Sequence, residues 1–97
     1  MEEVYTIGDL SIDWNAHEVT LEGEKVELTP QEFTLLRILI EKRNVCLSRQ
    51  RLLSEAWGTD FLGESRTVDV HIQKLRKKLK LEDHIKTVYK NGYRFED

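Results

Sequence analysis

Between residues 4 and 28 the chain alternates apolar and polar side chains. Three short runs place an apolar residue at every second position, and the residues concerned are Leu10, Ile12, Trp14, Val19, Leu21, Val26 and Leu28. Gly8-Asp9, Asn15-Ala16 and Glu22-Gly23 separate these runs. Period-two alternation broken by such pairs is typical of antiparallel strands joined by tight turns. The pattern predicts a meander of three or four strands with one apolar face, which a layer of helices must cover.

Residues 29–42 carry the signals of a helix and of its start. Thr29 suits the N-cap, Pro30 suits the first helical position, and Glu32 can reach back to close a capping box. The inward face is expected to hold Phe33, Leu36, Leu39 and Ile40, with Leu35 and Ile38 widening the apolar arc. We expect Asn44 to end the helix in a left-handed conformation.

A second helix is predicted from its N-cap, Ser48, to Trp57, with Arg51, Leu52, Leu53 and Ala56 along it. A loop bounded by glycines follows over residues 58–64, and Ser65 or Glu64 is expected to cap a third helix. The loop is longer than that of a simple helix-turn-helix. It also carries Phe61 and Leu62, which either lie under the helices or form a surface for a protein partner.

The third predicted helix, within residues 64–81, has two unlike faces. Val68, Ile72, Leu75 and Leu79 recur at the spacing of one helical stripe. At about 100° per residue, the opposite face holds Val70, Gln73, Lys74 and Lys77. The pattern therefore predicts an apolar edge packed on the core and a basic, polar back directed away from it.

The last strands are predicted to form a hairpin. Residues 85–89 and 93–95 have strand character, and Asn91-Gly92 between them is a strong signal for a two-residue turn. Lys90 would lie at its tip, with Arg94 beside it. A sheet, three helices and a hairpin, in that order, predict an α+β fold of the winged helix-turn-helix type.

Charge is unevenly distributed along the chain. Residues 66–80 contain six Lys or Arg and one Asp, a net charge of +5, whereas the whole chain carries −3, so the remainder sums to −8. The first 32 residues contain nine acids and one lysine, Lys25. Basic patches on acidic proteins bind polyanions by releasing counterions, so we expect the third helix to face a nucleic acid and the amino-terminal third to face away.

Composition narrows the class of protein further. The 97 residues suffice for one domain, with no apolar run of membrane-spanning length and no signal-peptide start. The one cysteine, Cys46, has no internal partner, which suits a reducing cytosol. His17, His71 and His84 lie far apart, and no metal-ligand spacing occurs. We therefore expect a cytoplasmic protein that is not an enzyme and needs neither cofactor nor metal.

Several motifs closely resemble the OmpR/PhoB-type effector domain of bacterial response regulators. They span residues 5–95 in order and nearly without gaps: Leu28-Thr29-Pro30-Gln31-Glu32-Phe33, Leu47-Ser48-Arg49, Ala56-Trp57-Gly58, Arg66-Thr67-Val68-Asp69-Val70-His71-Ile72, Leu75-Arg76-Lys77-Lys78-Leu79 and Gly92-Tyr93-Arg94-Phe95. The resemblance implies a four-stranded amino-terminal sheet, three helices and a carboxy-terminal wing. It further implies that the third helix enters the major groove and that two copies bind direct repeats head to tail.

The resemblance also implies roles for individual residues. We expect Val70, Gln73 and Lys74 to read bases, and the DNA backbone to be contacted by Trp57, Arg66, Thr67, His71, Arg76, Lys77, Thr87, Lys90 and Tyr93. The loop over residues 58–65 matches the segment that contacts RNA polymerase in this family, here Thr59, Asp60, Phe61, Leu62, Gly63 and Glu64. Full-length members carry a receiver domain, and nothing in this sequence resembles one. The chain is therefore either an excised effector domain, which we favour, or a regulator without a receiver, and we expect it to be monomeric in isolation.

The chain departs from the family pattern in the wing and in the third helix. Tyr89 stands where an arginine is expected in the wing, and Lys90 follows it. Gln73 and Lys74 stand where many members have arginines, and Gln can pair with adenine and Lys with guanine. Trp57 can pack in the core and still offer its indole N–H to a phosphate, whereas we expect Tyr93 to find little core on a two-stranded wing. The alternative function is a winged helix that binds only proteins.

Overall fold

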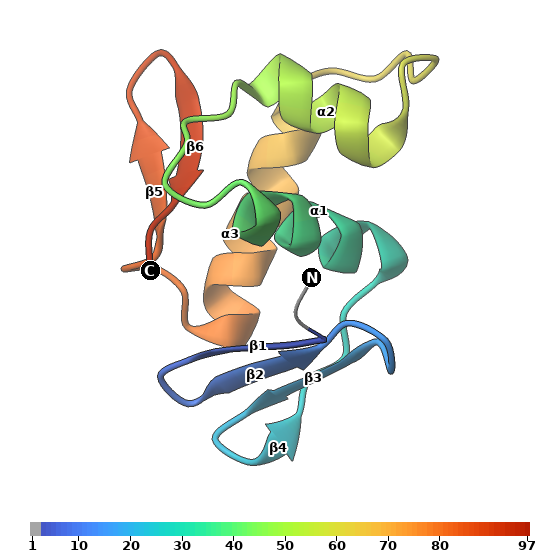
Figure 1. Ribbon diagram of the computed structural model, residues 1–97. Helices are drawn as coiled ribbons and strands as arrows, with labels where there is room; N and C mark the ends of the chain where they lie inside the picture. Colours follow the sequence, from blue (N-terminus) through green and yellow to red (C-terminus); the bar gives the residue numbers. More distant parts are fainter. Residues whose placement is uncertain (1–2) are drawn as a thin grey trace.

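The computed structural model describes residues 3–97 (Figure 1). Along the chain its elements are β1 (Val4–Ile7), β2 (Leu10–Asp13), β3 (Glu18–Leu21), β4 (Glu24–Lys25), α1 (Pro30–Glu41), α2 (Arg49–Trp57), α3 (Arg66–Leu79), β5 (Ile85–Val88) and β6 (Gly92–Phe95). The first four strands form one antiparallel sheet in chain order, and the last two form a separate antiparallel hairpin, the wing. The predicted α+β winged-helix architecture is confirmed.

The amino-terminal sheet follows the period-two pattern of its sequence. Leu10 and Ile12 of β2 are buried, and Ser11 and Asp13, which alternate with them, are only partly covered. Ile12 pairs with Val19 of β3, so the buried side chains of neighbouring strands lie on one face. The turns fall where the sequence predicts them. β4 is shorter than the alternation suggests, because its ladder ends at Lys25, before Val26 and Leu28.

The expected helix start at Thr29 is present in full. The Thr29 hydroxyl accepts the Glu32 N–H at 3.2 Å, and the Glu32 carboxylate accepts the Thr29 N–H at 2.9 Å, which closes the capping box. Asn44 is left-handed as predicted, with φ of 68°, although α1 ends three residues earlier. Its N–H then donates to the Phe95 carbonyl at 2.6 Å, so the chain leaving α1 is bound to β6.

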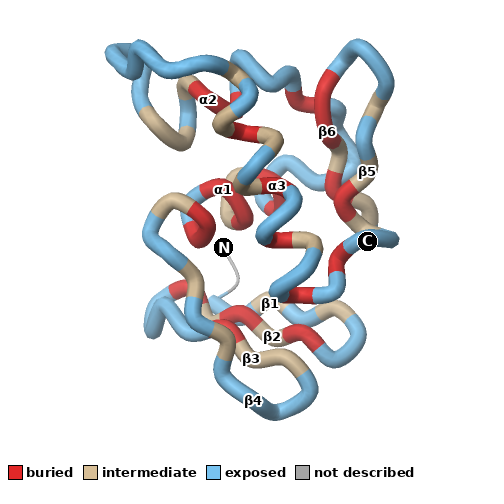
Figure 2. The backbone as a smooth tube through the Cα atoms, turned by 180° about the vertical axis from the view of Figure 1, so that it is seen from behind, coloured by how far each residue is buried: buried red, intermediate tan, exposed pale blue. Residues whose placement is uncertain are grey.

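The three helices pack between the amino-terminal sheet and the wing. Figure 1 shows α1 above the sheet and the wing standing along one side of the helices. The Trp14 ring of the strand layer meets the Phe33 ring of α1 edge to face, with centroids 5.6 Å apart. Buried side chains of both strand groups and all three helices form one cluster. In Figure 2 the buried segments gather where these layers face one another, and residues 58–64 and 89–91 are exposed.

The hairpin turn differs from the predicted two-residue turn at Asn91-Gly92. Val88 pairs with Gly92, which leaves a three-residue loop in which Lys90, with φ of 63°, takes the left-handed conformation. Gly92 is needed in the strand itself, because its φ is 143° and an added Cβ would collide with the Leu47 carbonyl oxygen. Gly92 therefore lies in β6, beside the chain before α2 that pairs with Tyr93, and not in the turn.

Candidate nucleic-acid interface

α3 buries the stripe that its sequence predicts. Val68, Ile72, Leu75 and Leu79 are all at most 1% exposed, and they pack against the residues of α1, α2 and the strands. Since these four side chains fix the rotation of the helix, they also fix which side faces outward. The predicted inward stripe is confirmed.

The outward side of α3 presents a mixed polar surface. Val70 is 48% exposed, and Gln73, Lys74 and Lys77 are exposed as well. The four include a methyl-bearing side chain, an amide that both donates and accepts, and two cations, which are the chemical types that read base edges in a major groove. The helical wheel thus identifies side chains that are exposed in the structure, which leaves them accessible to a ligand.

The cations of α3 and its C-cap divide into two groups. Lys78 donates to Glu32 of α1 at 2.7 Å, and Lys80 pairs with Glu22 at 2.8 Å. By contrast, Lys74 and Lys77 make no ion pair with any residue in 3–97. The net charge of +5 counted along residues 66–80 therefore overstates the charge that the outward face presents.

The partner of Lys78 is the one buried charged side chain among the described residues. Glu32 is 1% exposed. Burial opposes ionisation of its carboxyl, but the hydrogen bonds from Lys78 and from the Thr29 N–H, with the charges of Lys78 and Lys74, outweigh that effect and lower the pKa of Glu32. Glu32 therefore serves twice, as the capping-box carboxylate and as the anchor of α3 on α1.

Arg76 faces the wing and not only the solvent. Its Nε and Nη2 donate to the Ile85 carbonyl at 3.0 and 2.7 Å, and Nη2 also reaches the Thr87 hydroxyl at 2.8 Å. The guanidinium also lies over the Tyr93 ring, 5.6 Å from its centroid. These bonds engage Nε and Nη2 of the guanidinium and do not involve Nη1, so a contact of Arg76 with the DNA backbone stays a prediction.

Tyr93 also differs from its sequence-based interpretation. It is only 6% exposed, so its ring does join the core, since the pairing of β6 with the chain around Leu47 adds cover that a bare hairpin lacks. Its hydroxyl donates to Asp69 of α3 at 2.6 Å. Burial, together with the hydrogen bond to Asp69 and the charge of that carboxylate, raises the pKa of Tyr93 to about 12.

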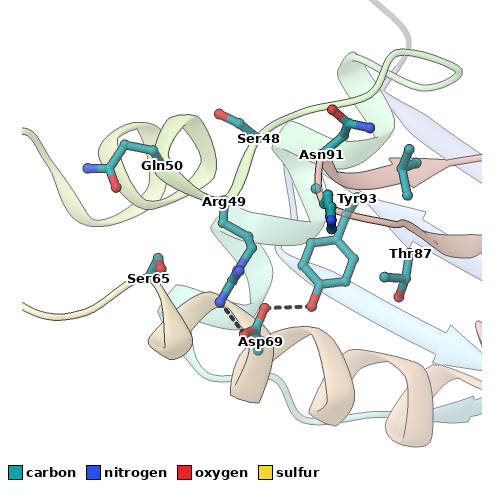
Figure 3. Close-up of a pocket in the computed structure, with 11 residues that line it drawn as sticks. Ser48, Arg49, Gln50, Ser65, Asp69, Thr87, Asn91 and Tyr93 are labelled. Atoms are coloured by element: carbon teal, nitrogen blue, oxygen red, sulfur yellow. Dashed lines mark hydrogen bonds and ion pairs between the residues drawn. The ribbon is translucent and has the colours of Figure 1, made fainter.

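Asp69 joins three elements, although its only predicted property is a negative charge in a basic helix. Besides the Tyr93 hydroxyl, it accepts the Arg49 guanidinium, from the first residue of α2, at 2.9 Å (Figure 3). The three residues lie 20 and 24 positions apart, so no local spacing signals their contact. A lone acid in the first turn of an otherwise basic helix is the only sequence feature that points to it.

A groove of about 380 Å³ separates the start of α2 and the first turn of α3 from the wing. Its lining residues are Ser48, Arg49, Gln50, Ser65, Asp69, Thr87, Val88, Lys90, Asn91, Gly92 and Tyr93. Thr87 and Lys90, two of the predicted backbone contacts, thus lie across the groove from the start of α3. Lys90 also lies 5.4 Å from the ring centroid of the exposed Tyr89, which places one cation and one free aromatic ring at the wing tip.

Three aromatic rings adjoin the amino-terminal half of α3. Trp57 meets His71 edge to face at 4.8 Å and Phe61 at 6.2 Å. The His71 Nδ1 lies 2.9 Å from the Thr67 carbonyl oxygen, and since a carbonyl only accepts, Nδ1 carries the proton and Nε2 is left for another partner. Trp57, Thr67 and His71 are all half-buried. Arg66 is exposed and faces Glu64 across 3.9 Å.

In the loop over residues 58–65, Phe61 and Leu62 differ in how far they are exposed, which bears on whether they lie under the helices or form a surface for a protein partner. Leu62 is 98% exposed, so it does not lie under the helices. Phe61 is 38% exposed and packs partly on Trp57. Ser65 is the N-cap residue of α3 as expected, but its side chain makes no capping hydrogen bond. The loop therefore presents one free apolar side chain beside a ring that is anchored to α2.

Neither a metal centre nor a membrane span emerges from the part of the chain that the structure describes. Within residues 3–97, no three His, Cys, Asp or Glu side chains gather in a way that could hold a metal ion. No helix there combines the length and apolar character needed to cross a bilayer. Cys46 is exposed.

The sequence is similar to those of proteins in a known family. Residues 23–95 match the profile of the family described as "Transcriptional regulatory protein, C terminal". The chain is 48% identical over 90 residues to the uncharacterized transcriptional regulatory protein YclJ of Bacillus subtilis, a match that covers 90% of this chain and 40% of YclJ. It is 42% identical over 98 residues to the phosphate regulon transcriptional regulatory protein PhoB of Escherichia coli, covering 98% of this chain and 43% of PhoB. The chain thus spans about two fifths of the length of these relatives.

A solved structure agrees in fold as well as sequence. The DNA-binding domain of Klebsiella pneumoniae RstA, determined in complex with the RstA box, superposes with a TM-score of 0.84 at 35% identity, and the match covers 98% of each chain. The family profile takes in α1, α2, α3 and the wing, and the superposition extends the likeness to the amino-terminal sheet. The chain belongs to the OmpR/PhoB-type family of transcriptional regulatory protein C-terminal domains.

Proposed function

We propose that this chain binds specific sequences of double-stranded DNA, as the output domain of a bacterial two-component response regulator that controls transcription. The observation that carries the proposal is the orientation of α3, whose buried stripe directs Val70, Gln73 and Lys74 outward. A helix with that face fits the major groove, and a neighbouring wing fits the adjacent backbone. The DNA complex formed by the RstA domain supports the same use of this fold.

Within that proposal the residues divide by task. Val70, Gln73 and Lys74 read base edges, and all three are exposed on the outward side of α3. The DNA backbone is contacted by Trp57, Arg66, Thr67, His71, Lys77, Thr87 and Lys90, all of which are exposed or half-buried. Arg76 and Tyr93, the other two predicted backbone contacts, also hold the wing, since Nε and Nη2 of Arg76 and the Tyr93 hydroxyl are bonded to Ile85, Thr87 and Asp69.

The partners follow from the family. We infer that two copies bind direct repeats head to tail, that the domain alone is monomeric, and that it functions in the cytoplasm joined to a receiver domain. We propose that the domain regulates transcription by binding and not by catalysing a reaction. The loop over residues 58–65 contacts RNA polymerase, and the support for this is Leu62, which lies free on the surface beside the anchored Phe61.

Selection from a pool of random duplexes tests DNA binding most broadly. Purified domain should enrich one motif, repeated in the same orientation at a fixed spacing, and binding should weaken as salt increases. Enrichment of no motif, together with no retardation of duplexes at low salt, would exclude DNA binding and favour a winged helix that binds only proteins.

The polymerase contact needs a variant that folds normally. Leu62→Asp changes a side chain that touches little of the domain, so we expect unchanged stability and DNA affinity but lost transcription activation in a reconstituted assay. Full activation by this variant would refute the contact. Phe61→Ala is less informative alone, because the ring packs on Trp57.

A further inference from the structure

Asp69 is an unexpected residue for a DNA-facing helix. It is the only acid between residues 66 and 80, and its side chain is 34% exposed at the groove between α3 and the wing. A carboxylate in this position repels phosphates. By charge alone, its replacement with a neutral residue would strengthen DNA binding.

The contacts of Asp69 indicate a different role. One carboxylate oxygen accepts the Tyr93 hydroxyl of β6 at 2.6 Å, and the other accepts the Arg49 guanidinium of α2 at 2.9 Å. Figure 3 shows both side chains converging on Asp69 from their separate elements. Both oxygens are therefore bonded to groups outside α3, and bonds to an ionised acceptor are stronger and more directional than neutral ones.

Tyr93 is itself firmly placed. Its backbone N–H and carbonyl are bonded to Leu47 at 2.9 and 2.8 Å, and its ring is buried under Arg76. A bond from Asp69 to this hydroxyl thus acts on the whole strand β6 and, through the paired β5, on Thr87. The position of the wing relative to α3 is fixed at this point and at Arg76.

We propose that Asp69 is a positioning residue for DNA binding. It holds the wing and the start of α2 at fixed places beside α3, so that Thr87 and Lys90 meet the backbone when the outward face of α3 meets the bases. The advantage is preorganisation, since a wing that is already placed loses less conformational freedom on binding. This inference rests on the proposed DNA-binding function, and it assigns Asp69 a favourable effect on affinity despite its charge.

The sign of the effect of Asp69→Asn separates positioning from charge. Asn keeps the shape and can still accept from Tyr93, but it cannot pair with Arg49 as a carboxylate does. We expect about tenfold weaker binding to the selected duplex, the size of one lost charged hydrogen bond. Asp83→Asn is the matched control, because Asp83 is exposed just after α3 and makes no side-chain hydrogen bond within the described residues. It should bind like the parent, within about twofold.

Tyr93→Phe removes only the hydroxyl and leaves the ring in the core, so it tests the same tie in a variant that keeps its packing. We expect Tyr93→Phe to bind the selected duplex about threefold more weakly than the parent. In the double variant with Asp69→Asn, the fold-loss in affinity should be smaller than the product of the two single fold-losses, because both substitutions remove the same tie. Hydroxyl-radical footprints should lose protection on the backbone flanking the motif, where the wing lies, and keep it over the bases met by α3. A domain that is merely less stable would lose protection of the flanking backbone and protection over the bases to the same extent.

Three results would overturn the proposal: binding by Asp69→Asn as tight as the parent or tighter, an intact flank footprint in both variants, or the same loss with Asp83→Asn. If Asp69→Asn fails to fold by circular dichroism, Tyr93→Phe decides alone. Failure of the parent itself to bind any duplex is a separate outcome, which rejects the proposed function and not the positioning role.

Discussion

Two pairs of lysines near the carboxy-terminal end of α3 have the same charge but different surroundings: one pair is bonded to acidic residues of the domain, and the other is exposed. Lys78 and Lys80 are bonded to Glu32 and Glu22, both in the acidic amino-terminal third. Lys74 and Lys77 are exposed and have no ion pair within residues 3–97. Charges of one sign on one helix thus divide between holding the helix in the protein and meeting a ligand.

The difference shows that charge counted along a sequence is not the charge a surface offers. The acids of the amino-terminal third do not simply face away from the nucleic acid, because Glu32 and Glu22 reach the far end of α3 and neutralise two of its cations. The bonded pair fixes where α3 lies, and the free pair is left for the ligand. The two pairs can therefore be separated by substitution, and the predictions below do so.

The largest effect is expected for Lys78→Met. Removing the ammonium leaves a carboxylate that is 1% exposed with only the Thr29 N–H, while the methionine keeps the aliphatic stem. Loss of a partner to a buried charge should lower the free energy of unfolding by about 2 to 3 kcal/mol. Urea denaturation measures this directly. Lys77→Met, one residue away on the free side, should stay within about 0.5 kcal/mol of the parent, and equal losses in the two variants would contradict the division.

The sequence predicts the features that depend on near neighbours. The capping box at Thr29, the Ser48 N-cap and the buried stripe from Val68 to Leu79 all follow from residues within a few turns of one another. These signals are local in the chain, so pattern alone reveals them, and a resemblance to a family adds the order of the elements.

The ties between elements could not be predicted in this way. Lys78 and Glu32 are 46 positions apart, and Tyr93 and Asp69 are 24 apart. Similarly, Gly92 lies in β6 against Leu47 and not in the turn, and no dipeptide signal contains that contact. The base that each outward side chain contacts could not be predicted either, because it depends on the sequence of the bound DNA and not on the protein sequence alone.

A smaller effect, on recognition rather than stability, is expected for Lys74→Ala. Because Lys74 is exposed on the outward face, its loss should cost about 1 to 2 kcal/mol of binding free energy and relax preference at one base pair. Titration against the selected duplex and its single-base variants tests both parts. A uniform loss over all variants would show that Lys74 contacts only the backbone.

Acid should lower the stability of the folded domain by protonating Glu32, the partner of Lys78. The pKa of Glu32 is lowered in the folded domain, so the stabilisation from its ionised form is complete above the ordinary glutamate value and is lost as pH falls through the lowered pKa. We therefore expect the free energy of unfolding of the parent to fall below about pH 4.5, which is the ordinary pKa of a glutamate side chain. Glu32→Gln should lose less over the same range, because Gln keeps the cap and does not titrate. Parallel pH profiles of unfolding would contradict this.

The central claim, that α3 offers DNA only its outward cations, is tested most directly by comparing Lys77→Gln with Lys80→Gln. Each variant loses one positive charge near the same end of the helix, but Lys80 is bonded to Glu22 and Lys77 is free. In plots of log affinity against log salt, Lys77→Gln should reduce the slope by about one unit, whereas Lys80→Gln should leave it unchanged. Equal slopes for the two variants, or a parent whose affinity ignores salt, would contradict the account.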